Sequence, residues 1–489
     1  MVKINTLNLN KWFAAFILLH LLAWTIAPIL MRFNLPMDAM EGATWGKQLE
    51  WGYDKNPFIN AWITGFAFQL GTDKAIYLFS QLSVVICFWA TYQLIKKIVT
   101  PFYAIVSVLA LEGLQYYNLH AIDLSDNTLE LSTWSLTILF FYNALTQKRL
   151  RDWLLTGLFA GLAMMTKYYS VLLLISLSMI LFLEFKKNDY KNPYVYCGLL
   201  LFLIIITPHL FWLAKYDFIT IHYTLGRISA ENTLWNHLFF PGQFIFQQAE
   251  VILPMFLLLL TLFIGKKPFR LSSTLTLTTF NQRFLFFAGG GPFLLTIFIS
   301  FLTGIQLRAA WGMPLFSLWG IGILLFLQPH ITFQKFYRFF IFIVLFLILN
   351  ITGYCLALYQ SAETSSANFP GKEIAKTLTS IWHTRNQTTL SYVAGTRWIA
   401  GNIAYYSPDH PTVFIEWDKN KSPWINESHF KKSGALFVWD TAAKEKIAID
   451  AIYKKYPKMT PIKTFYFHWD RNPNLPLITL QVAFLNPTK

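Results

Sequence analysis

The segments Asp38-Ala-Met-Glu41 and Trp51-Gly-Tyr-Asp-Lys-Asn-Pro-Phe-Ile-Asn-Ala-Trp62 form a polar, acidic stretch between two long apolar segments. The upstream apolar segment, Trp12 to Met31, contains no charged residue. It has the length of about 20 residues that a helix needs to cross the hydrocarbon core of a bilayer. The downstream apolar segment runs from about Ile76 to Ile95. The sequence therefore predicts an acidic loop that is tethered by two membrane-spanning helices.

The composition of the chain is that of a polytopic membrane protein. Of its 489 residues, 55% are hydrophobic and only 13% are charged, whereas a soluble domain carries about 25% charged residues. The net charge of +15 would also suit a nucleic-acid-binding protein. However, the basic residues form short clusters between apolar segments, a pattern typical of cytoplasmic loops, so we expect anionic lipid headgroups as partners and no nucleic acid. These clusters are Lys96-Lys97, Lys148-Arg149-Leu-Arg151, Lys186-Lys187 with Lys191, Lys266-Lys267 with Arg270, and Lys335 with Arg338.

The cysteines and the N-terminus are consistent with this class. Cys87, Cys197 and Cys355 all lie within apolar segments, and their spacing supports no disulfide framework or zinc site. Lys3 and Lys11 precede the first apolar segment as in a signal peptide, but this segment is longer than a signal sequence and no cleavage site follows it. We therefore expect a retained first helix with a cytoplasmic N-terminus.

We expect about eleven transmembrane helices. With a cytoplasmic N-terminus, this odd number places the C-terminal part outside the inner (plasma) membrane, in the periplasm of a Gram-negative cell. The same alternation places the loops 32–75, 119–127, 215–245 and 304–309 on the outer face. The expected helices cover residues 12–31, 76–95, 101–118, 128–146, 153–166, 169–185, 194–214, 246–264, 284–303, 310–328 and 338–358.

A soluble α/β domain is expected at residues 359–489, after a membrane domain at 1–358. Charged, Asn, Ser and Pro residues become more frequent there. Helical patterns near 371–385 and 442–455 alternate with β-rich runs, which indicates a small domain with a partly parallel sheet. The β-rich runs are Ser391–Ala394, Thr412–Trp417, Ala435–Trp439 and Leu477–Phe484.

Asp38 and Glu41 are the first candidate site residues. A carboxylate just beyond a helix end, at the boundary between membrane and water, can be partly desolvated and can act as a general base on a hydroxyl group. Asp38 and Glu41 also fit the N-cap of an amphipathic surface helix from about Ala39 to Trp51. The two interpretations are compatible, because an Asp that caps a helix can still face a cavity.

Three basic residues are candidates for phosphate binding. Lys55 could neutralise a phosphate as a point charge, or it could extend to lipid headgroups. Lys167, which two Tyr residues follow, could bind a lipid phosphate or could simply end a helix. Arg308 lies in a short outer link before Trp311; it could bind a phosphate through two N–H groups or anchor a helix end.

A second acidic cluster, His120, Asp123, Asp126 and Glu130, lies at the start of the expected helix 128–146. Ionisable residues at membrane depth are costly and are therefore candidates for function. Glu130 follows Asp126 by one helical turn, so the two share a face. Together with His120 they could hold a divalent cation, although no metal motif is met. Asp123 fits an ordinary surface-loop carboxylate.

Together, these residues resemble the polyprenyl-phosphate-dependent glycosyltransferases of the GT-C superfamily. The nearest branch is that of the bacterial relatives of protein O-mannosyltransferases and of the lipid A aminoarabinose transferase. The first outer loop keeps the spacing of this branch's pattern from Asp38 through Gly52-Tyr53 to Ala61-Trp62. It departs from the pattern at Ala39, where the family has Glu, and at Asn56-Pro57-Phe58, where the family has His-Pro-Pro.

Further segments extend the resemblance over most of the chain. In the membrane domain they are Asp126-Asn127-Thr128 through Trp134, Leu150 to Tyr168, and Arg308-Ala-Ala-Trp311-Gly-Met-Pro314. In the outer domain, three segments resemble a tail found in one bacterial subgroup: Tyr392-Val-Ala-Gly-Thr-Arg397-Trp398, Tyr406-Ser-Pro-Asp409 and Ser422-Pro-Trp424.

The resemblance implies the GT-C fold and an inverting transfer of a sugar. The sugar would move from an undecaprenyl-phosphate donor to a lipid or envelope-glycan acceptor, on the outer face of the inner membrane. Asp38 would act as the general base, with Glu41 beside it. Lys55, Lys167 and Arg308 would hold the departing lipid phosphate.

The resemblance also implies roles for the second cluster and for the outer domain. Asp126 and Glu130, with His120 nearby, would support the acceptor or a divalent cation such as Mg²⁺, Mn²⁺ or Zn²⁺. The departures at Ala39 and Asn56 weigh against metal use. The outer domain would shape the access of the acceptor rather than carry chemistry.

A transporter or flippase of a lipid-linked glycan is the main alternative. Such a protein would have ionisable residues at mid-membrane, in helices broken by Gly or Pro and related by a repeat. The candidate charges lie at the expected outer interface instead, which favours an enzyme. A scaffold that derives from a glycosyltransferase but lacks activity is a second alternative, and Ala39 and Asn56 give it some weight.

Overall fold

The computed structural model describes residues 6–185, 191–228, 233–264, 277–441 and 449–488. They form two compact units, which we describe separately. The helical unit comprises Met1–Ala27, Tyr77–Phe211 and His222–Gly353, and the mixed unit comprises Pro28–Ile76, Trp212–Ile221 and Tyr354–Lys489. The first loop, which contains Asp38, therefore belongs to the same compact unit as the C-terminal sheet. The predicted domain boundary near residue 358 stays a prediction.

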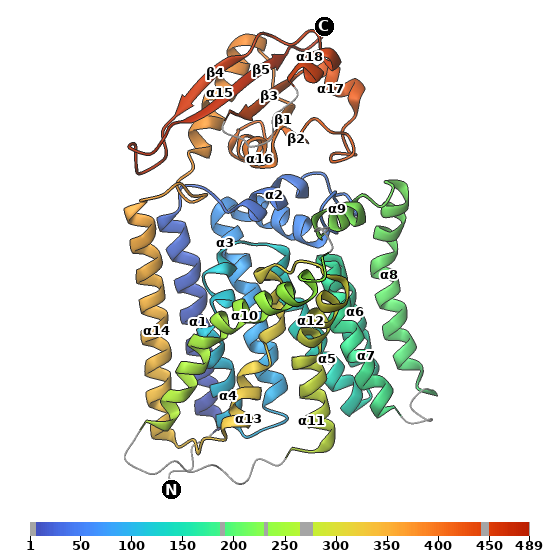
Figure 1. The fold of residues 1–489 in the computed structure, drawn as a ribbon, viewed down its shortest axis with the longest axis vertical. Coiled ribbons are helices and arrows are strands. Elements are labelled where there is room, and N and C mark those ends of the chain that lie inside the picture. The colour runs from blue at the N-terminus through green and yellow to red at the C-terminus, as the bar shows by residue number, and fades with distance from the viewer. Residues whose placement is uncertain (1–5, 186–190, 229–232, 265–276, 442–448, 489) are drawn as a thin grey trace. The chain divides into compact units, whose positions relative to one another are not determined.

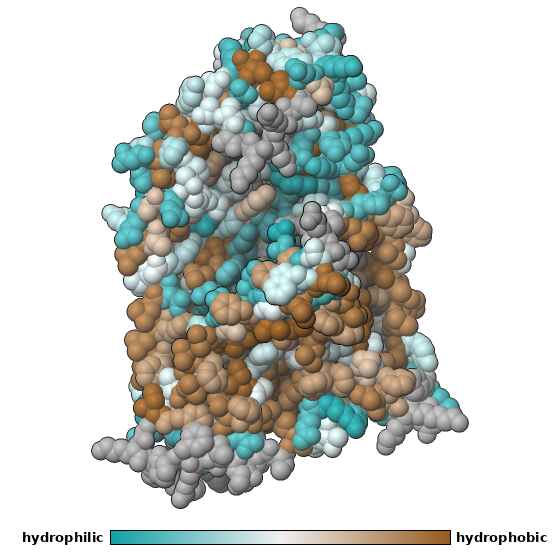
Figure 2. Space-filling view, in the orientation of Figure 1, coloured by the Kyte–Doolittle hydropathy of each residue, from teal (hydrophilic) through white to brown (hydrophobic). Residues whose placement is uncertain are grey.

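The helical unit consists of apolar helices, and hydrophobic side chains cover the face of it that Figure 2 shows. Among the described residues, six helices are long and apolar enough to cross a membrane, or seven if a bent pair counts as one span. The protein is thus a multi-pass membrane protein, while the number of eleven spans stays a prediction. The helices are α1 (Thr6–Met31), α3 (Ile59–Ile95), α4 (Pro101–Leu109), α5 (Asp126–Gln147), α6 (Leu150–Thr166), α7 (Val171–Glu184), α8 (Pro193–Lys215), α9 (Ile219–Ile228), α10 (Asn236–Leu260), α11 (Thr279–Leu285), α12 (Gly291–Thr303), α13 (Trp319–Leu327) and α14 (Phe333–Gln360), some of which continue into the mixed unit (Figure 1).

Two expected helices are interrupted in the structure. The helix expected at 101–118 is α-helical only as far as Leu109 and continues as 3₁₀ turns over Ala110–Gly113 and Gln115–Tyr117. The helix expected at 310–328 consists of a 3₁₀ segment, Ala309–Phe316, and α13, with a bend of 67° between them. Pro314 lies inside the 3₁₀ segment, and its missing N–H disfavours a regular helix.

Two expected loops are partly helical. Residues 59–70, which the sequence placed in the first outer loop, form the first part of α3. The break in α3 comes at Thr72, whose φ of 53° a continuous helix does not allow. The loop expected at 215–245 contains α9 and the first turns of α10.

The basic clusters gather at one end of the helical unit. Lys97 at the end of α3 donates to Asn143 near the end of α5. Arg283 of α11 pairs with Glu184 at the end of α7, with 2.9 Å between Nη1 and Oε1. Arg338 Nη2, at the start of α14, donates to a backbone carbonyl after α10 at 2.6 Å. A single positive end is what the positive-inside pattern predicts. Lys186, Lys187, Lys266, Lys267 and Arg270 lie outside the described residues.

The C-terminal part of the mixed unit contains a five-stranded sheet in the order β2-β1-β3-β5-β4. β1 pairs in parallel with β2 and β3, whereas β5 is antiparallel to both β3 and β4. The partly parallel sheet is therefore as the alternating pattern predicted, although β4 was not expected. The strands are β1 (Tyr392–Gly395), β2 (Thr412–Ile415), β3 (Ala435–Asp440), β4 (Lys463–Phe467) and β5 (Ile478–Leu485).

Helices cover both faces of this sheet. On one face, Phe430 of α17 (Glu427–Ser433) and Tyr456, just after α18 (Ile449–Lys455), pack against Phe437 of β3. On the other face, Trp382 of α15 (Gly371–Asn386) lies against Phe484 of β5. α16 (Arg397–Tyr406) follows β1 directly. Helices were expected near α15 and α18, whereas α16 and α17 were not predicted; residues 442–448 of the last expected helix lie outside the described part.

A buried ionisable pair joins two segments of the helical unit. Nδ1 of His20 in α1 lies 2.6 Å from Oε2 of Glu112, and both side chains are fully buried. Trp24 Nε1 donates to the other carboxylate oxygen at 3.3 Å, and Asn118 Nδ2 donates to the backbone carbonyl of Glu112 at 2.9 Å. Because a buried ionisable group without its partner is costly, the two segments depend on this contact.

We predict that His20→Ala destabilises the protein by about 3 kcal/mol, because it leaves the Glu112 carboxylate buried without its main partner. The double variant His20→Leu/Glu112→Leu should recover most of this loss, since it removes both polar groups. Thermal unfolding in detergent measures the effect, and His330→Ala, at an exposed position, is the control. Equal stability of His20→Ala and the wild type would contradict the prediction.

Candidate active site in the first loop

Asp38 lies in the first turn of helix α2 (Met37–Gly46), which lies between α1 and α3 in the sequence. The N-cap residue is Pro36, which makes no side-chain capping bond, so the interpretation of Asp38 as the N-cap is wrong. A carboxylate in the first helical turn is still favoured by the helix dipole. The Asp38 side chain retains 36% exposure, whereas Glu41, one turn later, retains 7%.

Small residues fix the position of α2. A Cβ atom on Gly46 would lie 2.2 Å from the carbonyl oxygen of Ala61 and 2.6 Å from the Cα atom of Gly65. The helix therefore packs directly on the backbone of the first part of α3. α2 is shorter than the helix expected to reach Trp51, because the chain leaves it after Gly46 and turns at Leu49, whose φ is 48°.

An aromatic cluster holds the loop that follows α2. The rings of Trp45 and Tyr53 stack with 5.0 Å between centroids, and the Tyr53 hydroxyl donates to the Trp45 carbonyl at 3.0 Å. Burial raises the pKa of the Tyr53 hydroxyl, so it stays protonated as a donor. The Thr220 hydroxyl donates to the Tyr53 carbonyl at 2.9 Å. The loop backbone from Gly52 to Pro57 is thereby held in place.

Lys55 lies between the two carboxylates of α2. Its Nζ atom lies 2.8 Å from Oε2 of Glu41 and 3.2 Å from Oδ1 of Asp38. The three residues predicted for this loop are thus brought together by the structure. Asp38 is the most exposed of them, and its ion pair is with Lys55.

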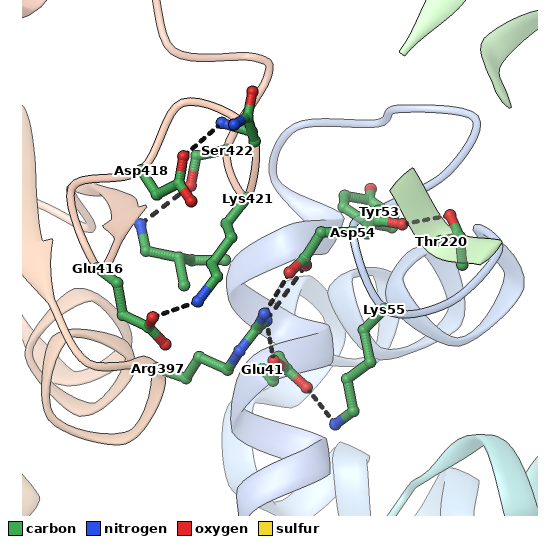
Figure 3. A network of polar contacts seen from close by, with 12 residues as sticks. Glu41, Tyr53, Asp54, Lys55, Thr220, Arg397, Glu416, Asp418, Lys421 and Ser422 are labelled. Atoms are coloured by element: carbon green, nitrogen blue, oxygen red, sulfur yellow. Dashed lines mark hydrogen bonds and ion pairs between the residues drawn. The ribbon is translucent and has the colours of Figure 1, made fainter. Parts of the chain in front are cut away.

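Arg397, the first residue of α16, completes this network (Figure 3). Its Nη1 atom lies 2.8 Å from Oε1 of Glu41 and 3.2 Å from Oδ1 of Asp54, and its Nη2 atom pairs with Oδ2 of Asp54. Asp54 is 2% exposed and Arg397 is 13% exposed. We call Asp38, Glu41, Asp54, Lys55 and Arg397 the loop network.

The loop network is electrostatically almost balanced, since three carboxylates face two cations. Burial raises the pKa of Asp54, and the Arg397 guanidinium opposes this rise. Burial lowers the pKa of Arg397, but Glu41 and Asp54 together raise it above its usual range. The sequence did not single out Asp54 or a role for Arg397. Arg397 occurs in a segment that carries the family resemblance, which was the only signal for it.

The opposite face of α2 lines a cavity of about 210 Å³. Thr44 and Lys47 of α2, Phe68 of α3, and Tyr405 and His410 of the C-terminal part are among the lining residues. The Lys47 ammonium donates to the backbone carbonyl of His410. The two faces of α2 therefore have separate polar surroundings, and Asp38 belongs to the face with the loop network.

In the helical unit, Lys167 and Glu130 belong to a second polar cluster. Lys167 Nζ donates to Asn127 and lies 3.9 Å from Oε2 of Glu130. The Ser170 hydroxyl donates to the other carboxylate oxygen of Glu130 at 3.2 Å. The ring of Trp311 lies 5.8 Å from the Lys167 ammonium. This cluster presents a partly buried cation that lies against two aromatic rings, those of Tyr169 and Trp311.

Three further candidate site residues of the helical unit are Asp126, His120 and Arg308. Asp126 is the first residue of α5 and is buried. His120 is exposed, and its Nδ1 atom lies 3.2 Å from the Gln115 carbonyl. Arg308 is exposed at the N-cap position of the 3₁₀ segment 309–316.

The carboxylates at these sites do not fit a divalent cation well. Within the described ranges, no group of three or more His, Cys, Asp or Glu side chains could hold a metal ion. Glu41 and Asp54 are already paired with Arg397, and Glu130 has Lys167 and Ser170 as neighbours.

The fold is that of a multi-pass membrane protein of the GT-C class. The fold class inferred from the sequence is therefore confirmed, and so is the resemblance to GT-C glycosyltransferases. Two comparisons with known proteins carry this conclusion.

Residues 55–212 match the sequence profile of the dolichyl-phosphate-mannose-protein mannosyltransferases. The crystal structure of ArnT from Cupriavidus metallidurans bound to undecaprenyl phosphate matches with a TM-score of 0.61 at 13% identity, over 97% of this chain and 98% of that chain. The apo structure of the same protein matches with a TM-score of 0.60 at 14% identity, over the same shares. Among curated proteins, no sequence matches the chain significantly.

The close approach at Gly46 leads to a prediction with a matched control. Gly46→Ala should destabilise the protein by about 2 kcal/mol, because its Cβ would meet the backbone of α3. Gly401→Ala, also on a helix of the mixed unit, should be tolerated or slightly stabilising, since its Cβ would lie 3.5 Å from a Met40 side-chain atom. Thermal unfolding of both variants is the measurement, and an equal response would contradict the direct packing of α2 on the backbone of α3.

Proposed function

We propose that the protein is an integral-membrane glycosyltransferase that moves a sugar from an undecaprenyl-phosphate donor to a hydroxyl group of a lipid or envelope-glycan acceptor. The observation that carries this proposal is the pairing of a half-exposed carboxylate, Asp38, with a cation, Lys55, at 3.2 Å. The similarity of the fold to a protein crystallised with undecaprenyl phosphate supports the choice of donor.

In the proposed reaction, the acceptor hydroxyl attacks the anomeric carbon of the sugar and its proton passes to Asp38. The bond between that carbon and the phosphate oxygen breaks, and the lipid phosphate leaves with the electron pair. Attack from the side opposite the leaving group inverts the anomeric centre. Lys55 neutralises the charge that develops on the departing phosphate. Glu41 holds Lys55 in place at 2.8 Å.

We propose Lys167 and Arg308 as further phosphate-binding residues and Asp126, Glu130 and His120 as acceptor-binding candidates. The positive charge of the Lys167 ammonium, which is 17% exposed, supports its role. We also propose that the N-terminus is cytoplasmic and that the C-terminal domain lies outside the inner membrane. The gathering of basic residues at one end of the helical unit supports this orientation. An alkaline phosphatase fused to the C-terminus would be active only if the orientation is correct.

A transporter or flippase of a lipid-linked glycan is the second candidate. The buried His20–Glu112 pair favours it, because such proteins place ionisable residues inside the membrane. The two candidates differ in what Asp38→Asn changes. A glycosyltransferase loses sugar transfer, whereas a flippase keeps its movement of lipid-linked sugar between the leaflets of proteoliposomes.

The test of the general base is Asp38→Asn in intact cells. We expect transfer to fall at least about 100-fold, since a positioned general base contributes a factor of roughly 10² to 10⁴. Mass spectrometry of extracted lipids and envelope glycans measures the product. Asp73→Asn, which changes a carboxylate of the same unit that pairs with Tyr405, is the control. An inserted Asp38→Asn variant with an unchanged glycan profile would refute the assignment.

Metal dependence is tested by chelation. Because Glu41 and Asp54 are occupied by Arg397 and Lys55, we expect EDTA to leave the rate of transfer by the purified protein unchanged. A loss of activity that Mg²⁺, Mn²⁺ or Zn²⁺ restores would show that a divalent cation takes part.

A further inference from the structure

Arg397 binds the first loop from a segment far along the chain. It lies 343 residues after Asp54 in the sequence and yet makes two contacts with the Asp54 carboxylate. It also contacts Glu41 at 2.8 Å. The ring of Trp424 lies against Tyr53 with 5.6 Å between centroids, so the C-terminal part touches the loop at a second point. These contacts all lie within the mixed unit.

The local structure around Arg397 is rigid. β1 lies between β2 and β3 in the sheet, and α16 begins two residues after it, with Thr396 as its N-cap. The Thr396 side chain accepts a hydrogen bond from the backbone N–H of Ile399. Arg397 thus extends from the junction of a central strand with a capped helix, which limits its freedom to move.

The position of Lys55 depends on both carboxylates that Arg397 binds. Asp54 is the residue before Lys55 in the chain, so its anchoring fixes the backbone from which Lys55 extends. Glu41 is shared, since Oε1 contacts Arg397 and Oε2 contacts Lys55. Arg397 therefore affects the position of Lys55 in two ways, through the backbone at Asp54 and through the carboxylate of Glu41.

We propose that Arg397 is a positioning residue for the reaction: it holds Asp54 and Glu41 so that Lys55 lies beside Asp38 and can receive the lipid phosphate. The inference rests on the proposed function. It assigns the C-terminal domain a direct part in building the phosphate site, beyond the access of the acceptor.

Arginine suits this task and lysine does not. The planar guanidinium presents several N–H groups in a fixed fork, and can therefore bind two carboxylates at once in a defined geometry. An ammonium group at the same place would supply the charge without the geometry. Arg397→Lys therefore separates the effect of charge from the effect of position.

Loss of the positive charge of Arg397 would also make the site repel the anionic lipid donor. Without Arg397, three carboxylates face Lys55 alone, and the excess of negative charge rises from one to two. An anionic lipid phosphate then meets a more negative site. The double variant Asp54→Asn/Arg397→Gln restores the original excess of one, because it removes one charge of each sign.

The test measures the binding of undecaprenyl phosphate itself to the full-length protein in nanodiscs at pH 8, at low and high salt. We expect Arg397→Gln to weaken binding about tenfold, with the larger difference at low salt. Arg397→Lys should fall between this variant and the wild type. The double variant should stay at least about threefold weaker than the wild type, because it restores the net charge but not the guanidinium that holds Glu41. Arg385→Gln, which changes an arginine of the same domain that pairs with Asn486, should bind as the wild type does.

The outcomes separate this inference from the proposed function. If the wild type does not bind undecaprenyl phosphate, the proposed function fails. If the wild type binds and folded Arg397→Gln binds equally well, Arg397 is not a positioning residue. The inference is also overturned if the double variant binds as tightly as the wild type, because the net charge alone would then account for the effect of Arg397→Gln. If Arg397→Gln does not fold, the binding of undecaprenyl phosphate by Arg397→Lys and by the double variant is compared with that of the wild type instead.

Discussion

The contact between the Arg397 guanidinium and the carboxylates of Glu41 and Asp54 holds the first loop in its conformation. Taking charged groups out of water is costly, and only close pairing with good geometry offsets that cost. Asp54 is 2% exposed and Glu41 is 7% exposed, so neither could be left without its partner. These contacts therefore stabilise the arrangement of the loop in which Lys55 lies beside Asp38.

The sequence located the chemistry of this loop but not the network that holds it. Asp38, Glu41 and Lys55 could be predicted, because they lie in one polar stretch between apolar segments and match a family pattern. The approach of Lys55 to within 3.2 Å of both carboxylates could not be predicted, since it depends on the turn after α2. Arg397 comes from a distant strand–helix junction, and no periodicity connects residues so far apart. The burial of Asp54 could not be predicted, because an exposed loop carboxylate and a buried one look alike in a sequence.

The membrane part shows a similar division. Apolar length predicted most helices, because the bilayer imposes a minimum length and requires the backbone to bond internally. It did not predict the break at Thr72 or the bent segment at 309–327, which depend on local backbone geometry. The apolar pattern also did not predict the His20–Glu112 pair. A single polar residue barely changes the average hydropathy of a long apolar segment. Glu130 was predicted as a candidate, whereas Ser170, which donates to its carboxylate, was not.

The two cations of the loop network differ in flexibility and in hydrogen-bond geometry, and each suits its position in the network. Arg397 binds two carboxylates through a rigid fork and belongs to a sheet-anchored part of the chain. Lys55 is a point charge on a flexible stem, and its ammonium group can shift from a carboxylate to a phosphate without loss of hydrogen-bond geometry. In the proposed reaction, charge moves onto the departing phosphate while Asp38 takes up a proton. Lys55 must be mobile if it is to follow the negative charge onto the phosphate. The carboxylates of Glu41 and Asp54, which bring Lys55 back beside Asp38, must stay fixed. These two carboxylates therefore need a buried cation of their own, which is Arg397.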